Sequence, residues 1–164
     1  MLLKIKDFVF KILYILILIY LLIFIPSFFG HKPLVVVSGS MQPILKVGVI
    51  LYYEESNISD FKEGDILVFE LNDHTISHRI VDVEDNYFLT KGDANNSIDS
   101  YEVYHNQVIG KGTNWSIPYI GYYADFIYTH KYLLFISIFL IVMDLGNDFY
   151  KNRRRKCGEL NEKN

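Results

Sequence analysis

Hydrophobic residues gather at the two ends of this chain, while its middle alternates short apolar runs with polar breaks. From Phe8 to Phe29 the only charged residue is Lys11. A bilayer-spanning helix needs about 20 apolar residues, and in lipid its backbone groups must bond within the segment. We therefore expect a helical anchor over residues 1–30 that stops or kinks near Pro26. The apolar run exceeds the core of about 7–15 residues found in cleaved signal peptides, so the anchor is predicted to be retained.

A second apolar segment occupies residues 119–145. Its purely apolar part, Tyr132 to Met143, is too short to span a bilayer alone. Extension back to Ile120 reaches adequate length but includes Asp125, His130 and Lys131. The alternatives are a full span and a helix that lies in the interface or re-enters the membrane. We expect a second transmembrane helix, with Lys131 reaching toward the interface from a position near one end.

Basic residues next to these segments predict how the chain is oriented. The run Arg153-Arg154-Arg155-Lys156 follows the second segment, and Lys4 and Lys6 precede the first. Lysine and arginine near membrane segments favour the cytoplasmic side. We therefore expect both termini in the cytoplasm of a cell-membrane protein, with residues 146–164 as a basic tail. Residues 31–118 are then expected to lie on the extracytoplasmic face.

The middle of the chain is predicted to be mainly β. Runs rich in β-branched and aromatic residues are separated by polar turn residues, and no helical periodicity of useful length appears there. The expected strands are Val35–Val37, Val47–Glu55, Ile66–Leu71, Thr75–Val83, Tyr87–Thr90 and Val108–Gly112. Short strands with frequent turns favour a small β-barrel or sandwich. Residues 92–100, "GDANNSIDS", are expected to form a polar loop.

Composition excludes several other classes of protein. The net charge of -3 argues against a nucleic-acid partner. The single cysteine, Cys157, excludes an intramolecular disulfide framework and a cysteine-rich zinc site. We expect neither a cofactor nor a metal ion. Triplets that start at Asn57, Asn95 and Asn114 are compatible with glycosylation of an outer domain but are common by chance.

Candidate chemistry centres on the stretch "VVVSGSMQP", in which Ser38 and Ser40 flank Gly39. A serine hydroxyl is a weak nucleophile without a neighbouring base. The candidate bases are Lys91 and the five histidines His31, His74, His78, His105 and His130. Asp93 and Asp99 could orient a histidine, as the third member of a catalytic triad does, or could simply belong to a solvated turn. Spacing alone leaves these alternatives open.

Several motifs together resemble the type I signal peptidases, membrane-bound serine endopeptidases that remove signal peptides from exported proteins. The stretch "SGSMQP" is similar to their nucleophile box, and "GDILVFE", "SHRIV" and "KGDANNSID" are similar to the next three boxes. "IPYIGYY" is similar to the end of the catalytic domain. The motifs occur in the family's order and cover most of the chain from Val35 to Tyr123. A histidine in place of the bacterial-type lysine is the pattern of the endoplasmic-reticulum and archaeal type.

The resemblance implies Ser40 as nucleophile, His78 as general base and Asp99 as the group that orients His78, with Asp93 as a supporting acid. By analogy, the Ser40 backbone N–H and the Ser38 hydroxyl would form the oxyanion hole. Gln42 departs from the acidic residue frequent at its position in this subtype. The implied partners are signal peptides with small residues at the first and third positions before the cut, the lipid bilayer and the secretion translocon.

Two alternative readings remain open. In one, Lys91 rather than His78 is the base, as in the bacterial-type enzymes. In the other, the chain is a non-catalytic, membrane-anchored β domain that binds or scaffolds partners. The joint presence of Ser40, His78 and Asp99 in their boxes favours the enzyme.

Overall fold

The computed structural model describes residues 2–161, without the side chains of residues 2–4, 152 and 155–161. Residues 162–164 of the predicted tail and the side chain of Cys157 therefore lie outside the described part. The chain divides into two compact units, of which one comprises Ile23–Phe126 and the other joins Met1–Leu22 to Ile127–Asn164. The first unit holds all seven described strands, and the second holds most of the long helices.

The N-terminal apolar segment forms helix α1 (Leu2–Phe24), followed by the short 3₁₀ helix η1 (Ile25–Phe29). The predicted stop near Pro26 is confirmed, because α1 ends two residues earlier and Pro26 lies in the first turn of the 3₁₀ helix. Proline lacks the N–H that would continue an α-helix, and Gly30, at φ 87°, closes the segment in a left-handed conformation. Residues 5–29 are long and apolar enough to cross a membrane, with mean hydropathy 2.9.

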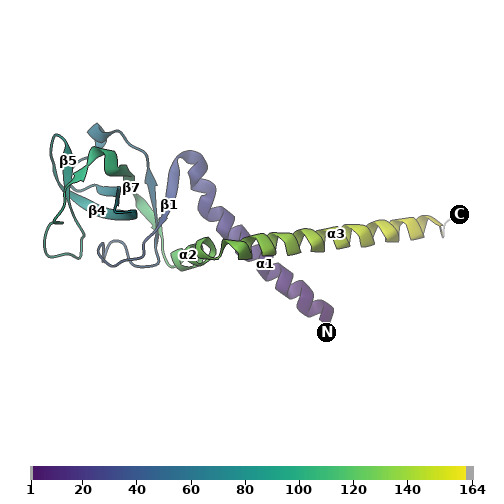
Figure 1. Ribbon diagram of the computed structural model, residues 1–164. Coiled ribbons are helices and arrows are strands. Elements are labelled where there is room, and N and C mark those ends of the chain that lie inside the picture. The colour runs from purple at the N-terminus through teal and green to yellow at the C-terminus, as the bar shows by residue number, and fades with distance from the viewer. Residues whose placement is uncertain (1, 162–164) are drawn as a thin grey trace. The chain divides into compact units, whose positions relative to one another are not determined.

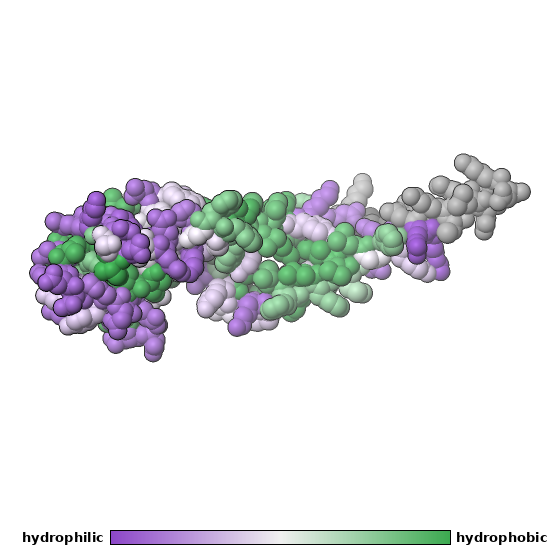
Figure 2. Space-filling view, turned by 90° about the horizontal axis from the view of Figure 1, so that it is seen from above, coloured by the Kyte–Doolittle hydropathy of each residue, from purple (hydrophilic) through white to green (hydrophobic). Residues whose placement is uncertain are grey.

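The C-terminal apolar segment differs from the predicted single helix. It forms two helices, α2 (Gly121–Thr129) and α3 (Lys131–Asn161), which are separated at His130. The candidate span is Lys131–Lys151, with mean hydropathy 1.7, so the extension back to Ile120 was wrong. Helix α3 reaches the required length by continuing past Met143 instead. Hydrophobic residues gather over α1 and α3 in Figure 2.

Seven strands form one antiparallel sheet, and the mainly β prediction is confirmed (Figure 1). The strands are β1 (His31–Val35), β2 (Ile50–Glu54), β3 (Ile66–Leu71), β4 (His74–Val83), β5 (Tyr87–Lys91), β6 (Val103–Tyr104) and β7 (Val108–Ile117). Their order across the sheet is β1-β2-β7-β3-β4-β5-β6. Two further 3₁₀ turns are η2 (Ile58–Asp60) and η3 (His105–Gln107).

Several strands begin or end away from their predicted positions, among them β2, which begins at Ile50 and not at Val47. The run Val35–Val37 does not form a strand of its own, because β1 ends at Val35 and the next two valines lead into a loop. Strand β7 continues five residues beyond the predicted Gly112, to Ile117. There it pairs with β2, on which Ile50 lies opposite Ile117. The polar residues of "TNWS" hid this extension because they break the apolar pattern.

The core consists of three packed clusters of apolar side chains. One includes Met41, Leu45 and Leu51 beneath the loop that follows β1. A second includes Phe69, Ile80 and Phe88 on β3, β4 and β5. The third joins Ile23, Ile50, Tyr52 and Ala124, and so connects the end of α1 and the start of α2 to the sheet. The first cluster includes Met41, which adjoins Ser40, and the second includes Phe69, whose ring contacts that of His78.

Candidate active site

Ser40 lies on the loop of residues 36–49, which connects β1 to β2. Backbone hydrogen bonds close this loop, from the Val36 N–H to the Val49 carbonyl and from the Gly48 N–H to the Val36 carbonyl, both at 2.9 Å. Met41 and Leu45 are buried in the first core cluster, at 1% and 3% exposure. Because its neighbour Met41 is held in the core, Ser40 has a defined position at the surface of the domain.

His78 lies on β4, at the point where the strand changes its partners. Residues 74–79 pair with β3, whereas β5 pairs with residues from 79 onward. The His78 side chain is only 8% exposed, and its ring lies edge-on to Phe69 at 6.4 Å between centroids. Its Nε2 atom lies 3.0 Å from Ser40 Oγ. An unprotonated Nε2 in this position can accept the serine proton.

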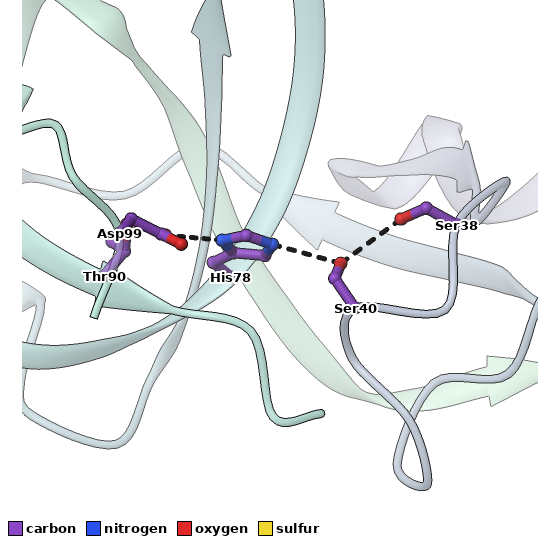
Figure 3. A network of polar contacts seen from close by, with 5 residues as sticks. All are labelled: Ser38, Ser40, His78, Thr90 and Asp99. Carbon is purple, nitrogen blue, oxygen red and sulfur yellow. Dashed lines mark hydrogen bonds and ion pairs between the residues drawn. The ribbon is translucent and has the colours of Figure 1, made fainter. Parts of the chain in front are cut away.

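Asp99 lies on the other side of the His78 ring, as Figure 3 shows. Its Oδ2 atom is 2.6 Å from His78 Nδ1, and the two side chains are almost equally buried. The same oxygen accepts a hydrogen bond of 2.8 Å from the Thr90 hydroxyl. Burial, together with the neighbouring Asp99 carboxylate, raises the pKa of Tyr101 to about 12. The Thr90 hydroxyl thus holds the Asp99 carboxylate in contact with the imidazole of His78, and Tyr101 lies beside it.

Asp93 binds Arg79 and not His78. Its two carboxylate oxygens accept hydrogen bonds from Arg79 Nε at 2.7 Å and from Arg79 Nη2 at 2.6 Å. Arg79 Nη1 also donates to the Gly64 carbonyl at 2.6 Å. The Asp93 carboxylate raises the pKa of the Arg79 guanidinium further above its usual value. Arg79 therefore ties the acidic loop to β4 and to the turn that precedes β3.

The acidic loop also contacts the serine loop directly. The Ala94 N–H donates to the Ser40 carbonyl at 2.8 Å, and the Asp99 N–H donates to the Thr90 carbonyl at 2.9 Å. A Cβ atom added to Gly92 would lie 2.6 Å from the Ser40 carbonyl oxygen and 3.0 Å from Ser40 Cβ. Only glycine allows this approach without a shift of backbone. The two loops thus position Ser40 and Asp99 on opposite sides of His78.

Ser38 contacts the hydroxyl of Ser40, with the two Oγ atoms 3.2 Å apart. Gly39, between them, does not adopt the left-handed conformation. A Cβ atom there would meet only the flexible amide of Gln42, at 3.4 Å. The turn therefore does not require glycine at position 39, although the missing side chain leaves space beside Ser40. The bond between Gln42 and Pro43 is a cis peptide.

The rival base Lys91 lies opposite Arg79 in the register of β4 and β5. Residues directly opposite in an antiparallel pair share a face, and successive residues alternate faces. Lys91 is therefore on the face of Arg79, away from that of His78. Among the described residues, His78 is the histidine whose ring contacts the Ser40 hydroxyl, through Nε2. Sequence reasoning did not single out Thr90, Arg79 or Gly92, although all three belong to or adjoin the quoted motifs.

A groove of about 300 Å³ opens beside Ser40 and His78. One wall is the segment of residues 34–38, and the other is residues 75–78 of β4. Within the described sheet, that part of β4 is paired on one side only, by β3. Apolar side chains of Leu34, Val36 and Ile76 contribute to the lining. An extended peptide could add its backbone to this strand edge and place alternate side chains in the groove.

The Ser40 hydroxyl contacts the His78 imidazole, which in turn contacts the Asp99 carboxylate. This arrangement, beside a groove that can take an extended peptide, is typical of serine proteases. The model of a family described as "Signal peptidase, peptidase S26" matches residues 8–83. "Signal peptidase I W" of Bacillus subtilis is 34% identical over 99 residues, which cover 57% of this chain and 52% of that protein. "Signal peptidase complex catalytic subunit SEC11" of Lodderomyces elongisporus is 35% identical over 121 residues, covering 64% and 71%.

A third relative, "Signal peptidase complex catalytic subunit SEC11" of Candida dubliniensis, is 36% identical over 130 residues, which cover 74% of this chain and 71% of that protein. The chain belongs to the peptidase S26 family of signal peptidases. The resemblance drawn from the sequence motifs is thus confirmed at the level of the family. The chain spans about half the length of the Bacillus protein.

Proposed function

We propose that this chain is a membrane-anchored serine endopeptidase that removes signal peptides from exported preproteins. The observation that supports it most directly is the contact sequence Ser40–His78–Asp99, with heavy-atom distances of 3.0 and 2.6 Å. Each of the three residues comes from a different segment, namely the loop after β1, strand β4 and the loop after β5. Family membership supports the same reaction, the hydrolysis of a peptide bond.

The proposed mechanism begins with proton transfer from Ser40 Oγ to His78 Nε2 as the hydroxyl attacks the scissile carbonyl. Asp99 holds the ring so that Nδ1 carries a proton and Nε2 is free, and it stabilises the imidazolium that forms. His78 then donates the proton to the leaving amine, which leaves an acyl group on Ser40. Water, activated by the same imidazole, hydrolyses this ester and restores the serine.

The oxyanion of each tetrahedral intermediate is proposed to accept hydrogen bonds from the Ser40 N–H and the Ser38 hydroxyl. The Ser38 Oγ atom, 3.2 Å from Ser40 Oγ, is close to the atom that attacks. One such donor typically lowers the barrier by about 2.7–4 kcal/mol. The substrate is proposed to lie extended in the groove between residues 34–38 and β4, where space beside the apolar lining suits small side chains before the cut.

The two candidate spans support a membrane location for the reaction. Residues 5–29 precede the β domain and residues 131–151 follow it. Basic residues outside both spans favour cytoplasmic termini and an extracytoplasmic β domain. A signal peptide that enters the membrane would deliver its cleavage site to that side. The SEC11 relatives are named as subunits of a complex, and partner subunits or the translocon are accordingly proposed as additional partners of this chain.

The deciding experiment mixes the purified full chain in detergent with a secretory precursor and follows cleavage. The parent protein is expected to cleave, whereas Ser40→Ala and His78→Ala are expected to be inactive. Ser59→Ala, an exposed serine in η2, is the matched control that should keep full activity. Loss of activity in Lys91→Ala but not in His78→Ala would reverse the assignment of the base. Absence of cleavage by the parent with every precursor tested would favour the scaffolding alternative.

A further inference from the structure

A carboxylate lies inside the second candidate membrane span. Asp144 of α3 belongs to the candidate span of residues 131–151, its side chain is only 12% exposed, and its Oδ1 atom is inaccessible. An ionised carboxylate within a bilayer is costly unless it has a partner of opposite charge. That partner is Lys6 of α1, in the candidate span of residues 5–29, whose Nζ atom lies 2.5 Å from Asp144 Oδ1. One ion pair therefore joins the two candidate spans.

The Lys6 side chain also contacts its own helix. Its Nζ atom lies 5.3 Å from the centre of the Phe10 ring, one turn further along α1. A cation over an aromatic face is attracted by the ring, and more strongly where water is excluded. The start of α1 and the whole of α3 belong to the same compact unit, Met1–Leu22 with Ile127–Asn164. Within this unit the ammonium group thus has both an aromatic ring and a carboxylate as neighbours.

Each of the two helices has one stripe of partly covered side chains among otherwise exposed ones. In residues 5–20 of α1 the partly covered side chains are Lys6, Phe10, Leu13, Ile17, Ile19 and Tyr20. In residues 131–150 of α3 they are Leu133, Leu134, Ser137, Ile141 and Asp144. Apart from Ile19, the members of each stripe recur every third or fourth residue, which is the spacing of a single helix face. Each helix therefore has one covered face, and the ion pair belongs to both faces.

The two stripes match each other in antiparallel order. With Lys6 opposite Asp144, the following members of the stripes are paired as Phe10 with Ile141 and Leu13 with Ser137. Rows with this spacing interlock when two helices lie nearly antiparallel. Ser137 is small, and its hydroxyl donates to the Leu133 carbonyl of its own helix at 2.7 Å. Small residues of this kind let two membrane helices approach closely.

We propose that the Lys6–Asp144 ion pair closes α1 and α3 into an antiparallel helix hairpin within the membrane. Each charge neutralises the other, and this allows a segment with an internal carboxylate to span the bilayer. In such a hairpin the start of α1 and the end of α3 lie on the same side of the membrane, as the basic residues outside both spans also predict. The hairpin rests on the membrane location proposed above, but not on the proposed proteolytic activity.

The test measures disulfide formation between the two stripes in the full chain, reconstituted in phosphatidylcholine vesicles. A Cys157→Ser background removes the chain's only cysteine. Leu13→Cys with Ser137→Cys places one thiol on each stripe. Ile15→Cys with Ser137→Cys is the matched control, because Ile15 lies on the same turn of α1 but is 55% exposed. A disulfide within one chain closes a large loop, so the monomer migrates faster on a gel without reductant.

Rapid oxidation is expected for the cysteines at positions 13 and 137, and little for the control pair. Lys6→Asp and Asp144→Lys each set two like charges against each other, and each should slow disulfide formation by roughly fivefold, within the range of coupling between residues in contact. The charge swap, which combines the two changes, should restore the rate. Asp148→Lys, at an exposed position one turn further along α3, is the matched control and should leave the rate unchanged.

Equal oxidation of the two cysteine pairs would overturn the proposal, as would disulfides that form only between chains, because the stripes would then not face each other within one chain. A charge swap as slow as the single variants would also overturn it, since the two charges would then not act on each other. The swap keeps the amino-acid composition, so a restored rate reports the pairing itself. The readout requires no cleavage of a precursor, so the hairpin and the proposed protease can fail independently.

Discussion

Asp93 binds Arg79 with both of its carboxylate oxygens, whereas Asp99 contacts Nδ1 of the His78 ring. The two carboxylates lie six residues apart in one polar loop. Their spacing did not divide their roles, although the family resemblance implied Asp99 as the orienting acid and Asp93 as a supporting one. The structure separates an acid that contacts the imidazole from an acid that ties the loop to β4. Their replacement should therefore have different effects.

Asp99→Asn is expected to lower kcat for precursor cleavage by roughly 10⁴-fold, the loss typical when the third member of a catalytic triad becomes neutral. Asp93→Asn is expected to retain far more activity but to lose stability, by about 1–2 kcal/mol of unfolding free energy, because a partly buried bidentate ion pair is lost. Steady-state cleavage and denaturant unfolding measure the two effects. Equal kinetic losses in the two variants would contradict the division of roles.

Thr90→Val is expected to lower kcat/KM by about fivefold, because Asp99 Oδ2 loses one hydrogen bond, worth roughly 1 kcal/mol. Valine keeps the shape of this fully buried side chain, and Thr90→Ser, which keeps the hydroxyl, should retain most activity. Steady-state cleavage measures both variants, and a loss in Thr90→Ser as large as that in Thr90→Val would contradict the role of the hydroxyl.

Activity of the parent protein is expected to fall once the solution is acid enough to protonate the imidazole of His78. A protonated Nε2 cannot accept the proton of Ser40, so the loss should approach tenfold per pH unit. Cleavage rates between pH 4 and pH 8 test this, with circular dichroism over the same range as the control for folding. A profile that stays flat to pH 4 would exclude His78 as the base.

Alkaline conditions are expected to destabilise the fold through Tyr101, whose pKa is raised to about 12. In the unfolded chain a tyrosine loses its proton near pH 10, whereas the folded protein keeps it. The unfolded state therefore binds fewer protons between these values, and stability falls as the pH rises from about 10 to 12. Tyr101→Phe should reduce this loss, measured by urea unfolding, and Tyr119→Phe, at an exposed position, should not.

Gly92→Ala is expected to reduce activity more than stability, because the added methyl group would push against the Ser40 carbonyl and Cβ. A shift of Ser40 by a fraction of an ångström would lengthen its 3.0 Å contact with His78. Gly146→Ala in α3, where an added Cβ meets nothing within 4 Å, is the matched control. A Gly92→Ala protein with parental kcat would show that the acidic loop can move without displacing the serine.

Periodicity and composition predicted the parts of this protein that depend on local sequence. The apolar run of residues 8–29 specifies a helix whatever surrounds it, and the alternation in β4 specifies a strand. The limits of local reasoning appear at Val36 and Val37, which have strand propensity but lie in a loop. They also appear at His130, where the second apolar segment is divided into α2 and α3.

By itself, the sequence determined that two apolar segments flank a mainly β domain, and its ordered motifs pointed to Ser40, His78 and Asp99. Only the tertiary structure decided which acid meets the imidazole, that Lys91 lies on the other face of the sheet, and that Thr90 and Gly92 support the site. These facts depend on strand register and on contacts between distant segments of the chain, such as that of Ser40 with His78, which lies 38 residues later. Hydrophobic patterning acts between near neighbours, whereas such contacts exist only when the whole core has packed.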